Sequence, residues 1–573
     1  MGVHQKLLFR MTTRLAKWLS SPRILRRLLI ALAWIITLIA LFYGEEHWRG
    51  KRAWTQYRRE LEGRGEQLDF AVLVPKPIPD DQNFAATPFV KSWFLRATNS
   101  ESQAAQDDRW KDDFAQADKL VSTMPIPSSE IMPPGVPPSS PDSTNNPPTA
   151  QRHRSENGRN FVDLVAWAQA FTAVRSGKSP ADDQIRKKEQ DRETRAQAAP
   201  AVLAGLRSSE PLLDELKAAA EKPRSVYPIV YDLDNPWGIR LPHLIQLKNA
   251  CRRLQLRACA ELAAGDSSAA FKDIELLFRI EDSVVAEPLV ISYLVRIACL
   301  QLATQAIWEG LAEQQWKDDQ LKSLEERLAA CNLFSDLKSP LDTERAAAIL
   351  TVDLLQRGKY NLNDLGAIES EHPANGPATV NFIGRIVPGG WYDLERLNYC
   401  LSFDTLLKGT MDAASERVWP DRVEANGREF ERQLFGGHLS RSWNVVGKHR
   451  LIAAMLLPAL GNISRKAAQG QTAVNQAAIA CALERYRLAN GHFPEKLEEL
   501  VPQFSAQLPH DVITGEPFHY RRDPDGRFTL YSVGWDQKDD GGTPGKSLFD
   551  DKAGDWLWEY PPTKKLQTHN PNP

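Results

Sequence analysis

The chain has 573 residues, and its 71 Lys and Arg residues against 73 Asp and Glu residues leave a formal net charge of -2. This length corresponds to two or more ordinary domains, and 42% hydrophobic residues is enough to form real cores. The balanced charge argues against a nucleic-acid binder, which carries a basic field. Six Cys in this length, with no C-x-x-C pair, exclude a disulfide scaffold and disfavour a Cys-rich zinc site.

An uncharged apolar run follows a basic N-terminus. Residues 1–27 carry seven Lys and Arg residues and no acid, and residues 28–44 read LLIALAWIITLIALFYG. Roughly 17–25 such residues span a bilayer, and a basic flank stays on the cytoplasmic side. A cleaved signal peptide is the alternative, but FYGEEHWRG offers no cleavage site of small residues. We expect an uncleaved signal anchor at 28–44 in the inner (cytoplasmic) membrane. It would be single-pass, with residues 1–27 cytoplasmic and the bulk of the chain periplasmic.

Two segments of different composition follow the anchor. Residues 45–70 are strongly charged and helix-forming, and prolines interrupt the residues after them. We expect a helical stalk with a Pro-containing segment at 45–122. Nine of residues 125–150 are proline, which neither a helix nor a central strand tolerates. The segment 123–155 is therefore predicted to be a Pro-rich linker.

The segment 156–446 is predicted to be a helical body, organised as a bundle or a solenoid-like array. Gly265 and Asp266 are expected to end one helix and cap the next. Residues 288–308 are apolar nearly all round, and Arg296 interrupts them, so we expect a buried core helix rather than a second membrane span. The helix expected before Gly265 shows apolar residues at three- and four-residue spacing, namely Leu244, Leu247, Cys251, Leu254, Ala258 and Leu262.

The sequence carries no strong catalytic motif. It lacks HExxH, GxSxG and GxGxxG, and GGTPGKS is one residue short of a P-loop. We therefore predict a non-enzymatic protein. Residues 333–447 are the least legible part of the chain, with helical stretches on either side of an IVPGGW sequence that we expect to be a turn. An enzyme with an unrecognised site in 333–447 remains an alternative.

The last hundred residues or so before the tail predict a small α+β domain with an antiparallel sheet, at 447–562. A long helix is expected to end at Gly491, because glycine adopts the left-handed conformation that stops a helix. A short helix at 496–500 and strands at 518–520 and 528–533 follow. Residues 563–573 are predicted to be a disordered tail.

The sequence elements of this region resemble the major pseudopilin of type II secretion systems. The matching elements are ALERYRLANGHFP, the LPHD…TGEPFHYR run, LYSVGWDQKDDGG and the closing DD…GDW, in the family's order. The resemblance covers about a fifth of the chain and implies a pseudopilin-like fold. The region departs from the family in having no processing motif, and its apolar run at 451–460 is too short to span a bilayer. We therefore expect a pseudopilin-like module rather than a filament subunit.

The resemblance also implies a calcium site in the loop after the last predicted strand. Ca²⁺ takes six to eight oxygen ligands in a flexible loop. The alternative is a solvated acidic turn. The acids that correspond to the family's calcium loop are Asp536, Asp539, Asp540, Asp550 and Asp551.

Taken together, these features predict a membrane-anchored extracytoplasmic protein. Its pseudopilin-like module would serve protein–protein assembly at the envelope. The expected partners are the lipid bilayer, through residues 28–44, and proteins of the cell envelope. An envelope scaffold that binds partners in a helical groove, unrelated to secretion, is an alternative.

Overall fold

The computed structural model describes residues 22–98, 159–175, 194–360, 387–436, 443–524 and 526–560. Within these residues the fold is mainly helical and its few strands pair antiparallel, which confirms the mainly α character expected from the sequence. The Pro-rich linker predicted at 123–155 and the tail predicted at 563–573 lie outside the described residues, as does most of the basic segment 1–27.

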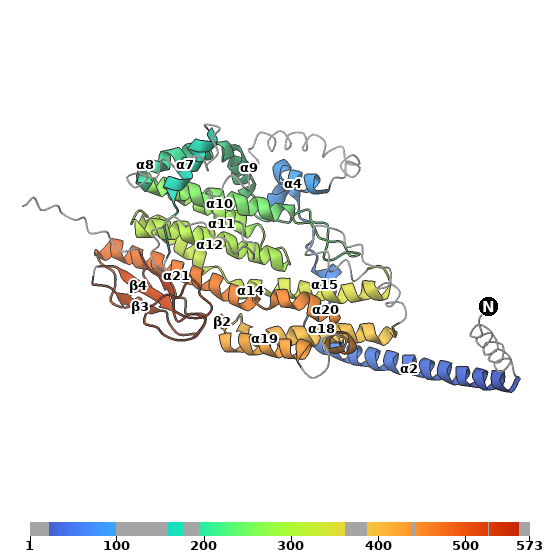
Figure 1. The fold of residues 1–573 in the computed structure, drawn as a ribbon. Helices are drawn as coiled ribbons and strands as arrows, with labels where there is room; N and C mark the ends of the chain where they lie inside the picture. Colours follow the sequence, from blue (N-terminus) through green and yellow to red (C-terminus); the bar gives the residue numbers. More distant parts are fainter. Residues whose placement is uncertain are drawn as a thin grey trace, which may run out of the picture. The chain divides into compact units, whose positions relative to one another are not determined.

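The elements are labelled in chain order in Figure 1. The helices up to residue 220 are α2 (Pro22–Gly63), α3 (Phe70–Leu73), η1 (Asp80–Gln82), η2 (Phe84–Ala86), α4 (Pro88–Thr98), α7 (Leu164–Arg175), α8 (Arg195–Leu206), η5 (Arg207–Ser209) and α9 (Glu210–Ala220). They continue with α10 (Pro242–Ala263), α11 (Ser267–Asp282), α12 (Val290–Ala312), α13 (Asp318–Ala329), α14 (Leu333–Asp336), α15 (Lys338–Gln356) and α18 (Gly389–Leu407). The remainder are β1 (Met411–Asp412), β2 (Arg417–Val418), α19 (Pro420–Phe435), η7 (Trp443–Gly447), α20 (Leu451–Leu456), η8 (Leu457–Leu460), α21 (Ile463–Asn490), η9 (Leu497–Leu500), β3 (His519–Arg522), β4 (Phe528–Ser532) and β5 (Trp556–Trp558).

The chain divides into two compact units. The first comprises Met1–Leu68, Ala347–Phe403 and Glu431–Pro458, and the second comprises the rest of the chain. Each unit is therefore built from segments far apart in the sequence.

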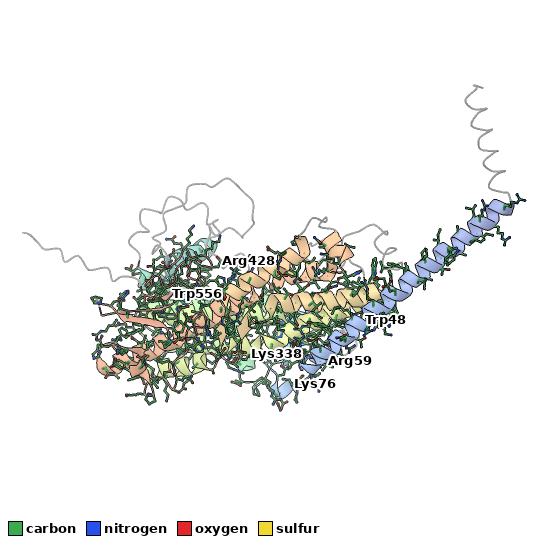
Figure 2. All side chains as sticks on the ribbon, turned by 90° about the horizontal axis from the view of Figure 1, so that it is seen from below. Trp48, Arg59, Lys76, Lys338, Arg428 and Trp556 are labelled. Atoms are coloured by element: carbon green, nitrogen blue, oxygen red, sulfur yellow. The ribbon has the colours of Figure 1, made fainter. Side chains whose placement is uncertain are left out.

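In the first unit, α2 is one continuous helix with two different parts. Its apolar part, within residues 28–44, is fully exposed, and the charged part that follows buries one side. Glu46, Gly50, Trp54 and Leu61 form that buried side at the spacing of a helix face. Trp48 lies on the other side of the helix and is exposed (Figure 2). The part of the predicted stalk up to Gly63 is thus a helix, but it is docked along one face rather than solvated all round, and residues 99–122 of the prediction lie outside the described chain.

The IVPGGW sequence, which was expected to be a turn, instead begins α18. Gly389 and Gly390 are the first residues of that helix, directly after Pro388. The turn prediction was therefore wrong at these two glycines. Their backbone lies against α2, where Glu46 accepts a hydrogen bond from the indole of Trp391 at 3.1 Å.

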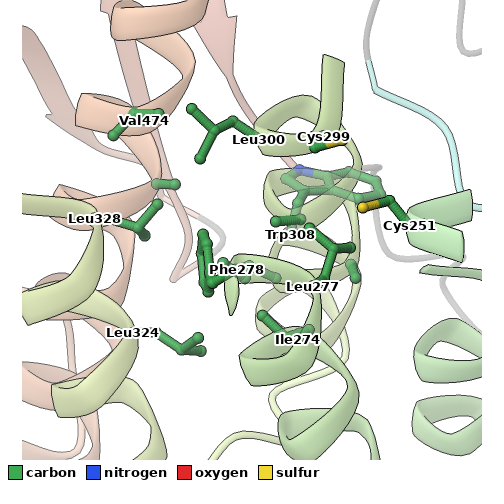
Figure 3. Packing of buried hydrophobic residues seen from close by; sticks show 14 of the residues in the cluster. Cys251, Ile274, Leu277, Phe278, Cys299, Leu300, Trp308, Leu324, Leu328 and Val474 are labelled. Atoms are coloured by element: carbon green, nitrogen blue, oxygen red, sulfur yellow. The ribbon is translucent and has the colours of Figure 1, made fainter. Parts of the chain in front are cut away.

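The second unit is built on three consecutive helices, α10, α11 and α12. Asp266 caps α11 by accepting a hydrogen bond from the amide of Ala269, and Gly265 has a φ of +85°, as the sequence predicts. The α10 stripe packs against α11 and α12, and Figure 3 shows Cys251, Leu277 and Trp308 in this core. The three helices lie as a layer between α4 and α8 on one side and α13 and α21 on the other (Figure 1).

Helix α12 is a core helix, as predicted from Arg296. Helices α2 and α12 are both long and apolar enough to cross a bilayer by length and composition, but more than half of the apolar window of α12 is buried inside the protein. Arg296 contacts Glu281 of α11 and Asp336 of α14. The charge that interrupts the apolar pattern is therefore neutralised within the core.

Helix α21 and the three-stranded sheet share this core. The sheet order is β3-β4-β5, with Tyr520 opposite Leu530 and Leu530 opposite Trp558. Every residue of α21 from Ala467 to Arg485 is buried, because α12 and α13 cover one side and β4 another. The domain boundary expected at 447 does not separate two hydrophobic cores.

Candidate functional site

The C-terminal acidic loop is the site that the sequence singles out. Helix α21 ends at Gly491, which has a φ of +81° and donates its amide to the carbonyl of Arg487 at 2.7 Å. Strands β3 and β4 then form from HYRR and FTLYS, and the aromatic residues in both favour a strand. The acidic residues lie between β4 and β5, on a Gly-rich connection of residues 533–555.

Two buried carboxylates hold this connection in place, and the first is Asp511. It accepts hydrogen bonds from the hydroxyl of Ser532 at 2.8 Å and from the amides of Ile513 at 3.0 Å and Val533 at 3.3 Å. Burial raises the pKa of Asp511, and these bonds only partly oppose that effect. Asp511 therefore ties the segment before β3 to the end of β4.

The second buried carboxylate is Asp555, immediately before β5. Its oxygens accept hydrogen bonds from the amides of Asp540 at 3.3 Å, Gly542 at 2.7 Å and Thr543 at 3.2 Å. Burial raises its pKa, and the bonds to the loop amides lower it. The acidic loop is thus wrapped around a carboxylate from its own far end.

The five acids predicted to bind a metal each have other roles in this arrangement. Asp539 accepts hydrogen bonds from the amide of Gly541 at 2.9 Å and the hydroxyl of Tyr531 at 3.0 Å. The hydrogen bond from Gly541 lowers the pKa of Asp539. Asp536 accepts the amide of Lys538, and Asp550 accepts the amides of Lys546 and Lys552. Asp551 pairs with Arg465 at 2.6 Å, and Asp540 contributes its amide to Asp555.

Calcium binding by this loop stays a prediction. In the part of the chain that the structure describes, no three His, Cys, Asp or Glu side chains gather as metal ligands. The loop directs backbone amides toward Asp555, whereas Ca²⁺ needs converging oxygens. The chemistry available here is therefore hydrogen bonding by a closed loop, and calcium would require the carboxylates to turn.

Sequence reasoning missed Asp555 as the centre of the loop. The signal for it was present, because Asp555 directly precedes WLW, a triplet that becomes the buried strand β5. An acid next to a buried strand is drawn inward and must find hydrogen-bond donors there. Strand β5 itself was also not predicted.

The C-terminal region is joined to the helical body through aromatic residues. The indole of Trp308 in α12 donates to the carbonyl of Glu559 at 2.8 Å, and its ring lies 6.3 Å from that of Tyr560. Arg159 lies over the ring of Trp558 at 4.4 Å. These contacts make the region a fixed part of the second unit.

Two acid clusters of 333–447, where an enzyme site was the alternative, have structural partners, whereas burial alone raises the pKa of Glu344 to about 7. Arg396 pairs with Asp353 and Asp393 at 2.5 and 2.8 Å. Glu395 accepts hydrogen bonds from the amides of Leu451 and Ile452 at the start of α20. Residues 361–386 and 437–442 of this region lie outside the described chain.

Comparison of this chain with family models, with curated proteins and with solved structures finds no match.

Proposed function

We propose that this protein is anchored in the inner membrane by residues 28–44 and acts in protein–protein assembly on the periplasmic side. Its N-terminus would be cytoplasmic. The C-terminal region, with its resemblance to the major pseudopilin, would be the assembly module.

The observation that carries the anchor is the contrast within α2. The exposed side chains of residues 28–44 include Leu32 at 52%, Trp34 at 65% and Ile36 at 58%, whereas the same helix buries Trp54 and Leu61. A fully exposed apolar helix of this length is unfavourable in water and favourable in hydrocarbon. The basic residues before it favour the cytoplasmic side.

The environment of α21 supports an assembly module rather than a filament subunit. Its buried faces are occupied by α12, α13 and β4, so this helix is not free to pack against other copies. The sheet and the acidic loop leave exposed surface beyond them, at residues 537–541. Contacts to envelope partners would be made by this outer surface.

Membrane insertion is tested by extraction of cell membranes at alkaline pH. The full chain should remain in the pellet, and Leu32→Arg combined with Ile36→Arg should release it, since each charge at a helix centre costs about 2.5–3.5 kcal/mol of insertion free energy. The control is Gln56→Arg on the exposed side of the same helix. Release of the wild-type chain would contradict the anchor.

The assembly role is tested by cross-linking the tagged full chain in cells of its source. Cross-links to pseudopilus components support the secretion connection. Cross-links to other envelope proteins alone would leave the anchor intact and favour the scaffold alternative.

A further inference from the structure

Six arginines are buried in the described part of the chain, and they differ in how their charge is balanced. Four of them face a carboxylate, and a fifth, Arg159, lies over the ring of Trp558. Arg253 has neither kind of partner. The four paired residues are Arg296 with Glu281, Arg345 with Asp404, Arg396 with Asp353 and Arg485 with Asp318.

Arg253 is 6% exposed, and its Nε is buried with no hydrogen-bond partner. No ion pair or hydrogen bond joins it to any other residue that the structure describes. Burial lowers the pKa of Arg253, and no carboxylate opposes that effect. Its two terminal nitrogens are not among the buried atoms without a partner, so they reach the protein surface, where a ligand can meet them.

A second polar side chain lies beside it. Asn249 is one turn earlier on α10, and residues four apart share a helix face. It is 8% exposed and likewise forms no hydrogen bond within the described chain. Together they present a guanidinium and an amide, which are both hydrogen-bond donors.

The two side chains lie on the side of α10 that faces away from Leu247, Cys251 and Leu254. That stripe packs on α11 and α12, whereas the other side of α10 is covered by α4 toward one end and α8 toward the other (Figure 1). The donors therefore lie on the side of α10 toward α4 and α8, away from the acidic loop. Arg252, the preceding residue, is exposed.

We propose that Arg253 and Asn249 bind a small oxyanion, a phosphate or a carboxylate group. Two neighbouring donors, one of them charged, match the oxygens of such a group, and the anion balances a cation that has no carboxylate partner among the described residues. The site is distinct from the assembly surface and does not depend on the proposed anchor.

The test uses the full chain in detergent, titrated with inorganic phosphate and separately with acetate, with sodium chloride balancing the ionic strength. A ligand that binds only the folded chain raises Tm in a saturable way. We expect this rise for the wild type and for the matched control Arg252→Gln. In Arg253→Gln the apparent Kd should be weakened about 10- to 100-fold, the effect of losing a charged hydrogen bond.

The two anions distinguish the source of the oxygens. A response to phosphate alone assigns a phosphate site, and a response to acetate alone assigns a carboxylate site. No saturable response to either anion in the wild type would overturn the proposal, and so would an equal response in Arg253→Gln.

A second variant guards against misfolding of the first. Arg253→Met keeps the apolar stem and removes the unpaired charge, so it should fold at least as stably as the wild type in chloride. It should not respond to phosphate or acetate, and equilibrium dialysis with labelled phosphate should show no binding. Retained binding by this variant would place the anion elsewhere.

Discussion

Gly50 of α2 and Gly390 of α18 bring two helix backbones into direct contact. A Cβ added to Gly50 would lie 2.1 Å from the carbonyl oxygen of Gly390, and a Cβ added to Gly390 would lie 2.0 Å from the carbonyl oxygen of Glu46. Backbone atoms cannot move aside as a flexible side chain does. The docked part of α2 is therefore held at a distance from α18 that only glycine permits.

Substitution of Gly50 should separate these helices. Gly50→Ala is expected to destabilise the first unit by about 1–3 kcal/mol, the usual cost of overpacking. The measurement is the thermal melt of the full chain, together with the rate of trypsin cleavage within residues 51–59. Gly63→Ala is the control, because a Cβ there meets nothing within 4 Å. An unchanged melt for Gly50→Ala would show that the contact does not hold α2.

The charge network at Arg296 should be important for stability. Besides Arg296, Glu281 is contacted by Arg327 at 2.6 Å. Arg296→Met leaves buried acids short of a partner, and breaking a buried pair costs about 3–5 kcal/mol. The free energy of unfolding of Arg296→Met is measured by chemical denaturation and compared with that of Lys322→Met. The second variant removes an exposed ion pair at 3.9 Å and should change stability by less than about 1 kcal/mol. Equal losses would contradict a special role for the core network.

Glu395 should make stability depend on pH. Burial raises its pKa to about 7 from 4.5, despite the amides of Leu451 and Ile452. The folded chain therefore holds this proton more tightly than the unfolded chain. The resulting stabilisation is full below pH 4.5 and is lost as the pH rises through about 7. Glu395→Gln should remove a change on the order of 2–3 kcal/mol over this window.

The measurement for Glu395 is the free energy of unfolding by denaturant at several pH values across that window. Relative to the wild type, Glu395→Gln should gain stability as the pH increases. Glu498→Gln, on an exposed side chain, should run parallel to the wild type. A Glu395→Gln curve that also runs parallel would exclude this carboxyl as the source.

Calcium binding at the acidic loop is tested by melting the full chain with Ca²⁺, with Mg²⁺ and with a chelator. Binding requires Asp539 to break its hydrogen bonds with Gly541 and Tyr531, so that its carboxylate can coordinate the ion. Selective stabilisation by Ca²⁺ should disappear in Asp539→Asn combined with Asp540→Asn, and should persist in the surface control Asp319→Asn. If Ca²⁺ does not change the melting temperature of the folded chain, the acidic loop does not bind calcium and keeps the closed form described above.

Asp555 should be the most sensitive acid of the loop. Asp555→Ala leaves three amides without their acceptor, at an expected cost of about 2–4 kcal/mol. Asp536→Ala removes one hydrogen bond to an exposed amide and should cost less than about 1 kcal/mol. Hydrogen exchange at Gly542 should accelerate in the first variant only. Similar exchange in both would show that Asp555 does not close the loop.

Several elements could be predicted because their signals are local. The α10 stripe, the cap at Asp266 and the helix stop at Gly491 depend on periodicity, on one side chain or on one glycine conformation. The apolar run in α2 likewise needs only its own composition. Patterns within one turn or one helix determine such features, so a single sequence contains them.

The site and the packing required the tertiary structure. The sequence marks Arg296 as a charge in an apolar helix, but only folding brings Glu281 to it. Charged residues around Gly50 suggested a solvated stalk, and Gly390 suggested a turn, because a close approach between residues 340 positions apart leaves no local pattern. Asp555 became the centre of the loop for the same reason. Composition and periodicity determined which helices form, whereas long-range contacts decided which buried charges are paired and which, like that of Arg253, are not.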